Sequence, residues 1–151
     1  GKENQGNNQN KNFPYKIFKV IGEGAFGKVK LGLHLDSGLK VAIKILEKKR
    51  IKEKDDKIRV SREIKILQTL SHENIISVSE ILHTKEKYYI VMEYCEGGEL
   101  FNYIIKRGRL TLKQSAFFYY QIINGLEYLH SKLIVHRDLK LGNLFLIGES
   151  F

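Results

Sequence analysis

The chain has 151 residues, of which 42% are hydrophobic and 28% charged, and its formal charge is +9. This length and apolar content suffice for one folded domain, and no apolar run approaches the roughly 20 residues of a membrane-spanning helix. The single cysteine, Cys95, excludes an intrachain disulfide, which fits a reducing compartment and predicts a cytoplasmic or nuclear protein.

The first segment, residues 1–12, is rich in Asn, Gln, Gly and Lys and contains no aromatic or β-branched residue. Such a segment cannot bury enough apolar surface to offset the entropy of ordering it. It also lacks the apolar region of a signal peptide. We therefore expect residues 1–12 to form a disordered polar tail.

A glycine-rich segment, GEGAFG at residues 22–27, lies between two stretches with the alternation of β-strands, 15–21 and 28–35. Glycines allow backbone N–H groups to approach phosphate oxygens closely. A dinucleotide-binding turn would instead open a helix and carry an acid about 20 positions on. Glu47 lies at that distance, but the strand pattern of 28–35 favours a strand–loop–strand hairpin.

The third block, VAIK at residues 41–44, predicts a strand that ends in Lys44. An ammonium group that points inward needs an anionic partner. Apolar residues recur at helical spacing within 57–70, where Glu63 and Leu67 share one face. We predict a helix over 57–70 and an ion pair between Lys44 and Glu63; the alternative is that Glu63 only joins the charged surface.

Residues 48–54, KKRIKEK, carry five Lys or Arg between the Lys44 strand and the Glu63 helix. Runs of this kind are most often solvated connections. We expect a solvated segment that contacts phosphates or an acidic partner, and we expect no nucleic-acid partner.

Three further elements complete the chain. Residues 88–94 predict a strand that enters a glycine turn and then a short helix. Residues 112–131 have the clearest helical periodicity, and Thr111 with Gln114 forms the capping-box pattern at their start. A short strand is expected over 144–147.

The segment HRDLKLGN, residues 136–143, places an Asp, a Lys and an Asn around one short loop. This trio suits phosphoryl transfer. Asp138 would accept the proton of an attacking hydroxyl, Lys140 would neutralise charge on the moving phosphoryl group, and Asn143 would hold a metal ion through its amide oxygen.

The three blocks GEGAFGKV, VAIK and HRDLKLGN closely resemble the motifs of eukaryotic protein kinases of the serine/threonine type. The resemblance covers about residues 15–151. It implies an α+β, bilobal fold: an antiparallel five-stranded N-lobe with one main helix (13–93), then a hinge and the first part of a helical C-lobe (94–151). Residues 92–101 resemble the calmodulin-dependent and AMP-activated group, and LGNLFL at 141–146 resembles Polo-type kinases.

The resemblance also implies ATP and Mg²⁺ as cofactors, with catalytic roles for Asp138, Lys140, Lys44 and Glu63 and a metal-binding role for Asn143. Its protein substrate would offer a Ser or Thr hydroxyl, and an upstream activating kinase would be a further partner. The residues expected to bind the nucleotide are Ile21, Gly22, Glu23, Gly24, Ala25, Phe26, Gly27, Val29, Ala42, Lys44, Met92, Glu93, Cys95, Glu99 and Phe145. Among them, Met92 would be the gatekeeper, Glu93 and Cys95 the hinge contacts, and Glu99 the neighbour of the ribose.

The printed chain ends at Phe151, before the Asp-Phe-Gly motif and the activation segment that the family pattern places next. We therefore expect this chain alone to show little phosphotransfer. The alternative is a non-catalytic module that binds a nucleotide or a partner. The intact catalytic-loop motif favours the kinase interpretation.

Overall fold

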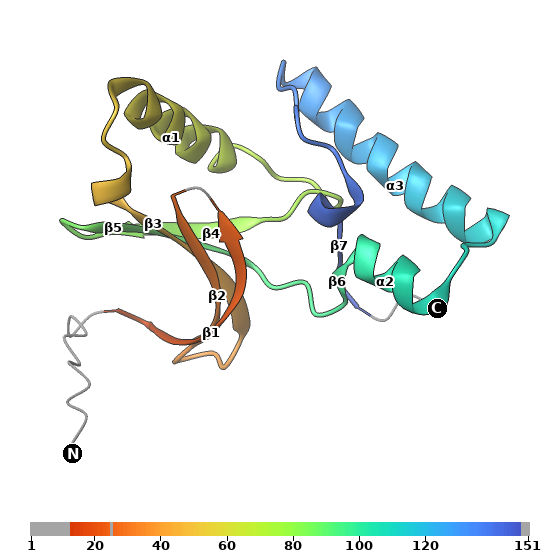
Figure 1. Cartoon of the computed structure of the whole chain (residues 1–151), viewed down its shortest axis with the longest axis horizontal. Helices are drawn as coiled ribbons and strands as arrows, with labels where there is room; N and C mark the ends of the chain where they lie inside the picture. The colour runs from red at the N-terminus through yellow and green to blue at the C-terminus, as the bar shows by residue number, and fades with distance from the viewer. Residues whose placement is uncertain (1–12, 25, 149–151) are drawn as a thin grey trace.

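The computed structural model describes residues 13–24 and 26–148, so the tail 1–12 and Ala25 of the glycine loop lie outside the described residues. Five antiparallel strands form one sheet in the order β1-β2-β3-β5-β4 (Figure 1), which confirms the expected five-stranded architecture. The strands are β1 (Tyr15–Gly24), β2 (Gly27–His34), β3 (Lys40–Glu47), β4 (Val78–His83) and β5 (Lys87–Glu93).

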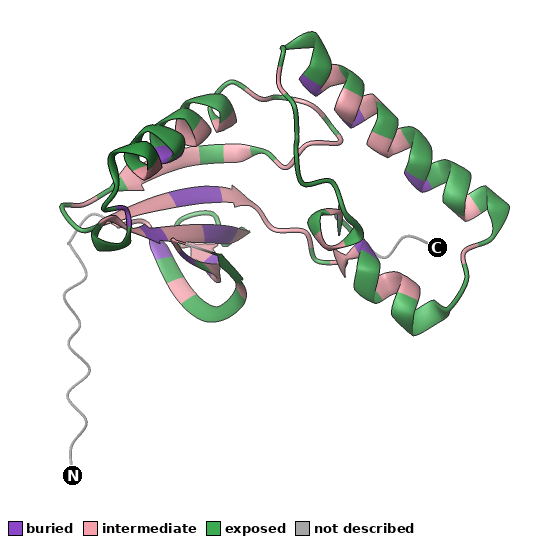
Figure 2. Ribbon diagram, turned by 45° about the horizontal axis from the view of Figure 1, so that its top comes forward, coloured by how far each residue is buried: buried purple, intermediate pink, exposed green. Residues whose placement is uncertain are grey.

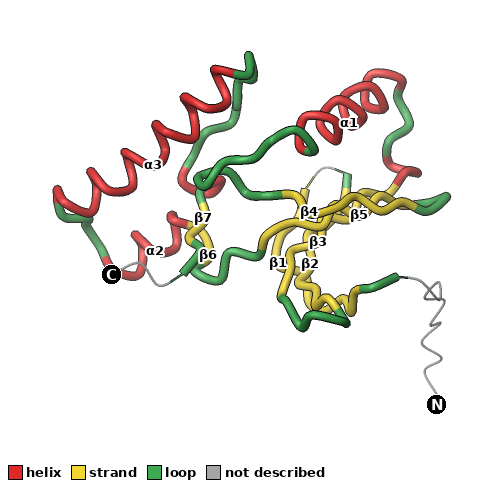
Figure 3. The backbone as a smooth tube through the Cα atoms, turned by 180° about the vertical axis from the view of Figure 1, so that it is seen from behind, coloured by secondary structure: helices red, strands yellow, loops and turns green. Residues whose placement is uncertain are grey.

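One helix covers a face of this sheet, and a second group of elements lies beyond β5 (Figures 1 and 3). Among the described residues, no helix is long and apolar enough to cross a membrane. The remaining elements are η1 (Lys48–Arg50), α1 (Lys54–Leu67), β6 (Gly98–Glu99), α2 (Leu100–Arg107), α3 (Leu112–Ser131), η2 (Leu141–Asn143) and β7 (Phe145–Leu146).

The boundaries of α1 differ from the prediction, whereas those of α3 agree with it. Helix α1 begins and ends earlier than the predicted range 57–70. Asp55 and Asp56 occupy its first turn, where carboxylates interact favourably with the helix dipole. In α3, Thr111 Oγ1 accepts the Gln114 N–H (3.2 Å) and Gln114 Oε1 accepts the Thr111 N–H (2.9 Å). The predicted capping box therefore fixes the start of α3.

The sheet buries side chains on both faces, as the alternation along β3 and β5 requires. Ile43 and Val91 pack with Tyr15 on one face. On the face that α1 covers, a second cluster joins Leu46, Ile51, Val60 and Ile90 (Figure 2). Each fully buried aliphatic side chain contributes about 1.5–3 kcal/mol, so α1 is held to the sheet mainly by this second cluster.

A third apolar cluster lies outside the sheet and joins α2, α3 and β7 through Leu100, Phe118 and Leu146. Strand β7 pairs with β6, with Glu99 opposite Phe145. Strand β7 directly follows the HRDLKLGN loop. Its pairing with β6 therefore fixes one end of that loop beside the segment between β5 and α2.

Gly27 gives a stability prediction, because β2 starts in very close contact with β3. A Cβ added at Gly27 would lie 1.7 Å from the carbonyl oxygen of Ile45. We expect Gly27→Ala to lower the free energy of unfolding by about 1–3 kcal/mol or more, since backbone has to move to relieve the clash. Urea denaturation measures this change.

Gly24→Ala is the matched control for Gly27→Ala on the opposite strand of the hairpin. Its added Cβ would meet only the Gly27 carbonyl oxygen, at 3.9 Å. Equal losses of stability in the two variants would contradict a steric origin at Gly27.

Candidate active site

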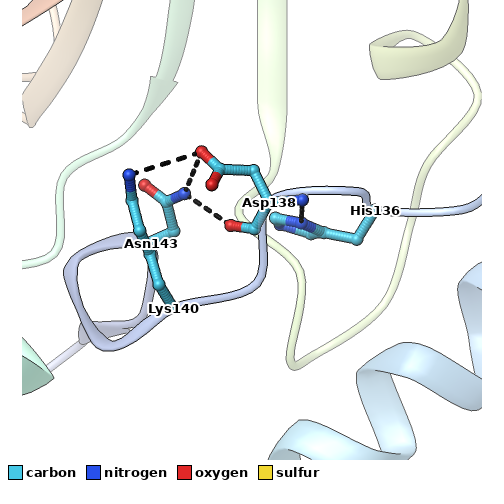
Figure 4. Close-up of polar contacts among 4 residues, drawn as sticks. All are labelled: His136, Asp138, Lys140 and Asn143. Atoms are coloured by element: carbon cyan, nitrogen blue, oxygen red, sulfur yellow. Dashed lines mark hydrogen bonds and ion pairs between the residues drawn. The ribbon is translucent and has the colours of Figure 1, made fainter.

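The HRDLKLGN segment forms a loop with a constrained backbone between α3 and β7. Arg137 has a φ of 66°, in the left-handed region that residues other than glycine rarely adopt. The backbone N–H of Asp138 donates to Nδ1 of His136 (3.2 Å, Figure 4). Strained residues of this kind cluster at functional sites, and here the strain and the hydrogen bond together set the direction of Asp138.

Asp138, Lys140 and Asn143 converge as the sequence predicted (Figure 4). Asn143 Nδ2 donates to the Asp138 carbonyl oxygen (2.7 Å) and to Asp138 Oδ2 (3.0 Å). Lys140 Nζ lies 3.5 Å from the same Oδ2, and the Asp138 and Lys140 side chains are 67% and 62% exposed. An ion pair this exposed adds little stability. Together with the Asn143 hydrogen bond, it instead orients a carboxylate that stays accessible to solvent.

The predicted pair between Lys44 and Glu63 is present. Lys44 Nζ on β3 lies 2.7 Å from Glu63 Oε1 on α1, with the two side chains 32% and 44% exposed. Leu67, on the same face of α1, packs against the apolar cluster beneath the helix. The docking of α1 on the sheet thus carries Glu63 to Lys44 across 19 residues of sequence.

Four of the residues expected around the nucleotide share one face of the sheet. Val29 lies opposite Lys44 in the β2–β3 pairing, and Ala42 lies opposite Met92 in the β3–β5 pairing. Directly opposed residues point to the same side, and so do residues two apart in one strand. Register alone therefore gathers Val29, Ala42, Lys44 and Met92 on the face that α1 covers. Their roles toward a nucleotide remain predictions.

The glycine segment closes an antiparallel hairpin in which Gly24 lies opposite Gly27. A strand follows it, so the hairpin interpretation is right and the dinucleotide-turn alternative is wrong. Phe26 packs against the cluster beneath α1, and its carbonyl oxygen accepts the Glu47 N–H (3.0 Å). The tip of the hairpin is therefore hydrogen-bonded to the end of β3, and the spacing of the glycines does not predict this bond.

The segment after β5 uses some of its backbone groups internally. The Glu93 N–H donates to the Ser77 carbonyl oxygen (3.0 Å), and the Cys95 carbonyl oxygen accepts the Gly98 N–H (3.1 Å). Glu93 Oε2 also accepts from the Ser77 N–H and Oγ, both at 3.3 Å. The Glu93 N–H and the Cys95 carbonyl oxygen are therefore engaged within the fold.

Two contacts near this segment were not anticipated from the sequence. Lys40 Nζ lies 2.7 Å from Glu96 Oε1, and the hydrogen bond to Glu96 raises the pKa of Lys40. Glu99 Oε2 lies 3.5 Å from Asn102 Nδ2, and a Cβ added at Gly142 would lie 4.0 Å from that oxygen. Glu99 thus lies beside Gly142 in the HRDLKLGN loop, and no local pattern in the sequence could have indicated this proximity or the Lys40–Glu96 pair.

Cys95 gives a prediction about reactivity. Burial, aided by the negative charge of Glu93, raises the pKa of its thiol from 9.0 to about 11. A raised pKa keeps the thiol protonated, and only the thiolate reacts quickly. At pH 8 we expect iodoacetamide to alkylate Cys95 roughly a hundredfold more slowly than a thiol of ordinary pKa.

The urea-unfolded chain is the control for this alkylation, because unfolding removes the burial that raises the pKa of Cys95. Equal alkylation rates for the folded and unfolded chains would contradict the protected thiol.

An open hollow of about 1390 Å³ separates α1 from α3 and reaches Glu63, His136, Asn143 and Phe145. On α3, Phe118 and Leu129 are buried. Part of the HRDLKLGN loop and Phe145 therefore line this hollow, which also extends along α3, whereas Asp138, Lys140 and Lys44 are not among its lining residues.

Known proteins match this chain over nearly its whole length. The model of the protein kinase domain matches residues 15–150. The SNF1-related protein kinase catalytic subunit alpha KIN12 of Arabidopsis thaliana is 49% identical over 135 residues, which is 89% of this chain and 27% of that protein. The maternal embryonic leucine zipper kinase of Danio rerio is 47% identical over 87% of this chain and 19% of its own length.

The serine/threonine protein kinase OSK3 of rice is 44% identical over 87% of this chain and 26% of its own length. The chain therefore spans about a quarter or less of the length of these relatives.

Proposed function

The chain belongs to the protein kinase family, and from this premise we propose that it forms the nucleotide-binding and catalytic-loop part of an ATP-dependent serine/threonine kinase. The reaction would transfer the γ-phosphate of ATP to a protein hydroxyl. The observation that carries the proposal is the convergence of Asp138, Lys140 and Asn143 in one exposed loop. A module that only binds a nucleotide would not need these three residues in contact.

In this reaction Asp138 accepts the proton of the attacking hydroxyl. The hydrogen bond from Asn143 Nδ2 holds the Asp138 carboxylate in place, and the hydrogen bond from the Asp138 backbone N–H to His136 Nδ1 holds the backbone. Lys140 lies beside the same carboxylate, where its charge would offset that of the phosphoryl group in transfer. These roles follow from positions and charges, because phosphoryl transfer depends mostly on alignment and electrostatic stabilisation.

Lys44 would bind the α- and β-phosphates, and Glu63 would hold its ammonium group in position. Val29, Ala42 and Met92 provide the apolar surface of the same face. The adenine ring would donate a hydrogen bond to the Glu93 carbonyl oxygen and accept one from the Cys95 N–H, since the Glu93 N–H and the Cys95 carbonyl oxygen are engaged internally. Phe145 would close the other side of the ring.

Asn143 suits Mg²⁺, because its amide oxygen is a hard donor of the type this ion prefers. Its Nδ2 is the atom that bonds Asp138, which leaves Oδ1 on the other side of the amide. Among the described residues, no group of three His, Cys, Asp or Glu side chains could hold a metal ion. Phosphate oxygens would supply further ligands, and the ion would add positive charge beside the phosphates.

Assignment to the calmodulin-dependent and AMP-activated group, with a Polo-like catalytic loop, is part of this proposal. So are regulation by an upstream kinase, for which Arg137 would pair with a phosphate, and a cytoplasmic or nuclear site of action. The relative from rice, a serine/threonine protein kinase by name, supports the serine/threonine class alone.

The experiment for the proposed function measures transfer of labelled γ-phosphate from ATP by the full-length gene product. Peptide pools that offer Ser and Thr are compared with pools that offer only Tyr, with and without Mg²⁺. We expect labelled Ser or Thr that depends on Mg²⁺. Nucleotide binding without any phosphotransfer would instead support the non-catalytic module, and labelling confined to Tyr would overturn the substrate class.

A further inference from the structure

The fold brings together two lysine-rich segments that are far apart in the sequence. Residues 48–54 follow β3, and residues 84–87 form the turn between β4 and β5 and the start of β5. Figures 1 and 3 place both at the end of the sheet away from β6 and β7. We call their combined surface the basic corner. It carries seven Lys or Arg and two Glu.

Lys48 joins the two segments. Its backbone N–H donates to the Glu86 carbonyl oxygen (2.8 Å), and its Nζ donates to the Thr84 carbonyl oxygen (2.6 Å). The same Nζ lies 4.5 Å from the centre of the Tyr88 ring. Lys48 therefore links the two segments of the corner by hydrogen bonds. Lys49, Arg50 and Lys52, which follow it, are exposed to solvent.

The corner is ordered by buried residues. Ile51, in the middle of the basic run, is buried with Leu46 and Val60 in the cluster beneath α1. The turn η1 fixes the residues before it. Because the backbone of the corner is held on both sides, this surface would lose little conformational entropy when a partner binds.

Most of the charge of the corner is not neutralised within the fold. Glu47 lies 3.3 Å from both Lys49 and Arg50, but the Lys49 side chain is 80% exposed. Within residues 13–24 and 26–148, Lys52 and Lys85 form no ion pair with another described residue. An excess of exposed cations raises the local concentration of anionic partners.

We propose that the basic corner binds an acidic segment of a protein partner. Residues 48–54 and 84–87 contain no aromatic side chain, and their one apolar residue, Ile51, is buried, so the exposed side chains of the corner are charged or polar. The corner therefore lacks the exposed aromatic rings on which bases stack and the exposed apolar side chains that anchor a surface helix in lipid. Carboxylates on an extended chain complement the excess of cations in the corner. This site lies apart from the catalytic loop and does not depend on the proposed function.

The test uses the printed chain and a fluorescent peptide of ten Glu residues, with binding followed by anisotropy at low salt. The corner variant is Lys49→Gln, Lys52→Gln and Lys85→Gln together. The control variant removes the same charge elsewhere, by Lys65→Gln, Lys106→Gln and Lys113→Gln on exposed helix surfaces. We expect the corner variant to bind the peptide about tenfold more weakly, from three exposed charge pairs, and the control variant to bind nearly as the original chain does.

Binding should also disappear at 1 M salt, where the Debye length is about 3 Å. Equal losses in the two variants would show that net charge alone attracts the peptide and would overturn the proposal. Tighter, corner-dependent binding of a single-stranded DNA decamer or of phosphatidylserine vesicles would overturn the choice of partner.

A measurement on the original chain keeps the test valid if the corner variant fails to fold. Amide NMR signals that shift with the Glu peptide are expected within 48–54 and 84–87. Shifts spread over the whole surface, or confined to the catalytic loop, would contradict the proposed site.

Discussion

Asp138→Asn is expected to lower the rate of phosphoryl transfer by the full-length gene product about 10²–10⁴-fold, the usual contribution of a positioned acid or base. The substitution keeps the shape of the side chain and an oxygen that Asn143 Nδ2 reaches at 3.0 Å. It removes only the group that accepts the proton. The affinity for ATP, measured by calorimetry, should therefore hardly change.

Asp36→Asn is the matched control, because Asp36 lies exposed in the turn between β2 and β3. It removes the same charge far from the catalytic loop and should leave the rate unchanged. Retention of the rate in Asp138→Asn, or an equal loss in Asp36→Asn, would contradict the role of Asp138 as proton acceptor.

Lys44→Met is expected to reduce phosphotransfer by about 10²–10³-fold, the loss seen when one charge-stabilising donor is removed from an active site. Methionine keeps most of the length of the side chain but loses the ammonium group that lies 2.7 Å from Glu63 Oε1. Because this pair is partly exposed, the free energy of unfolding should change by less than about 1 kcal/mol. The expected signature is a large kinetic loss in a folded protein.

Two further variants distinguish the proposed contact of Lys44 with the nucleotide from the proposed role of Glu63 in positioning Lys44. Glu63→Gln should cause a smaller loss than Lys44→Met, because it leaves the ammonium group in place and weakens only its orientation. Lys65→Met, on the exposed surface of α1, should have no effect on the rate. A loss in Glu63→Gln that exceeds the loss in Lys44→Met would contradict the assigned roles.

Much of the candidate site could be predicted because the residues of the HRDLKLGN motif are close together in the sequence. Asp138, Lys140 and Asn143 lie within six residues, so a short loop is enough to bring them together. The Lys44–Glu63 pair required more of the fold, but the strand and helix periods fixed the face of each residue. The packing of α1 on the sheet brings Lys44 Nζ to within 2.7 Å of Glu63 Oε1.

Other features depended on contacts that no local pattern encodes. Lys40 and Glu96 lie 56 residues apart in a chain with many charges, so their pairing could not be selected from the sequence. The start of α1 at Lys54 has a different cause, because the prediction followed the apolar repeat and overlooked the local signal of the acidic first turn. The close approach of Gly27 to Ile45 arises only when β2 pairs with β3.

The sequence by itself determined four of the five strands of the main sheet, the limits of α3 and the convergence of Asp138, Lys140 and Asn143, because alternation, capping and motif spacing act between near neighbours. Strand β4 (Val78–His83) was expected only through the family resemblance. The tertiary structure alone decided that residues 48–54 meet residues 84–87, and that Glu99 lies beside Gly142. These contacts follow from strand order and helix docking, which depend on the burial of side chains from distant segments. Long-range packing, and not local preference, therefore completes both the candidate active site and the basic corner.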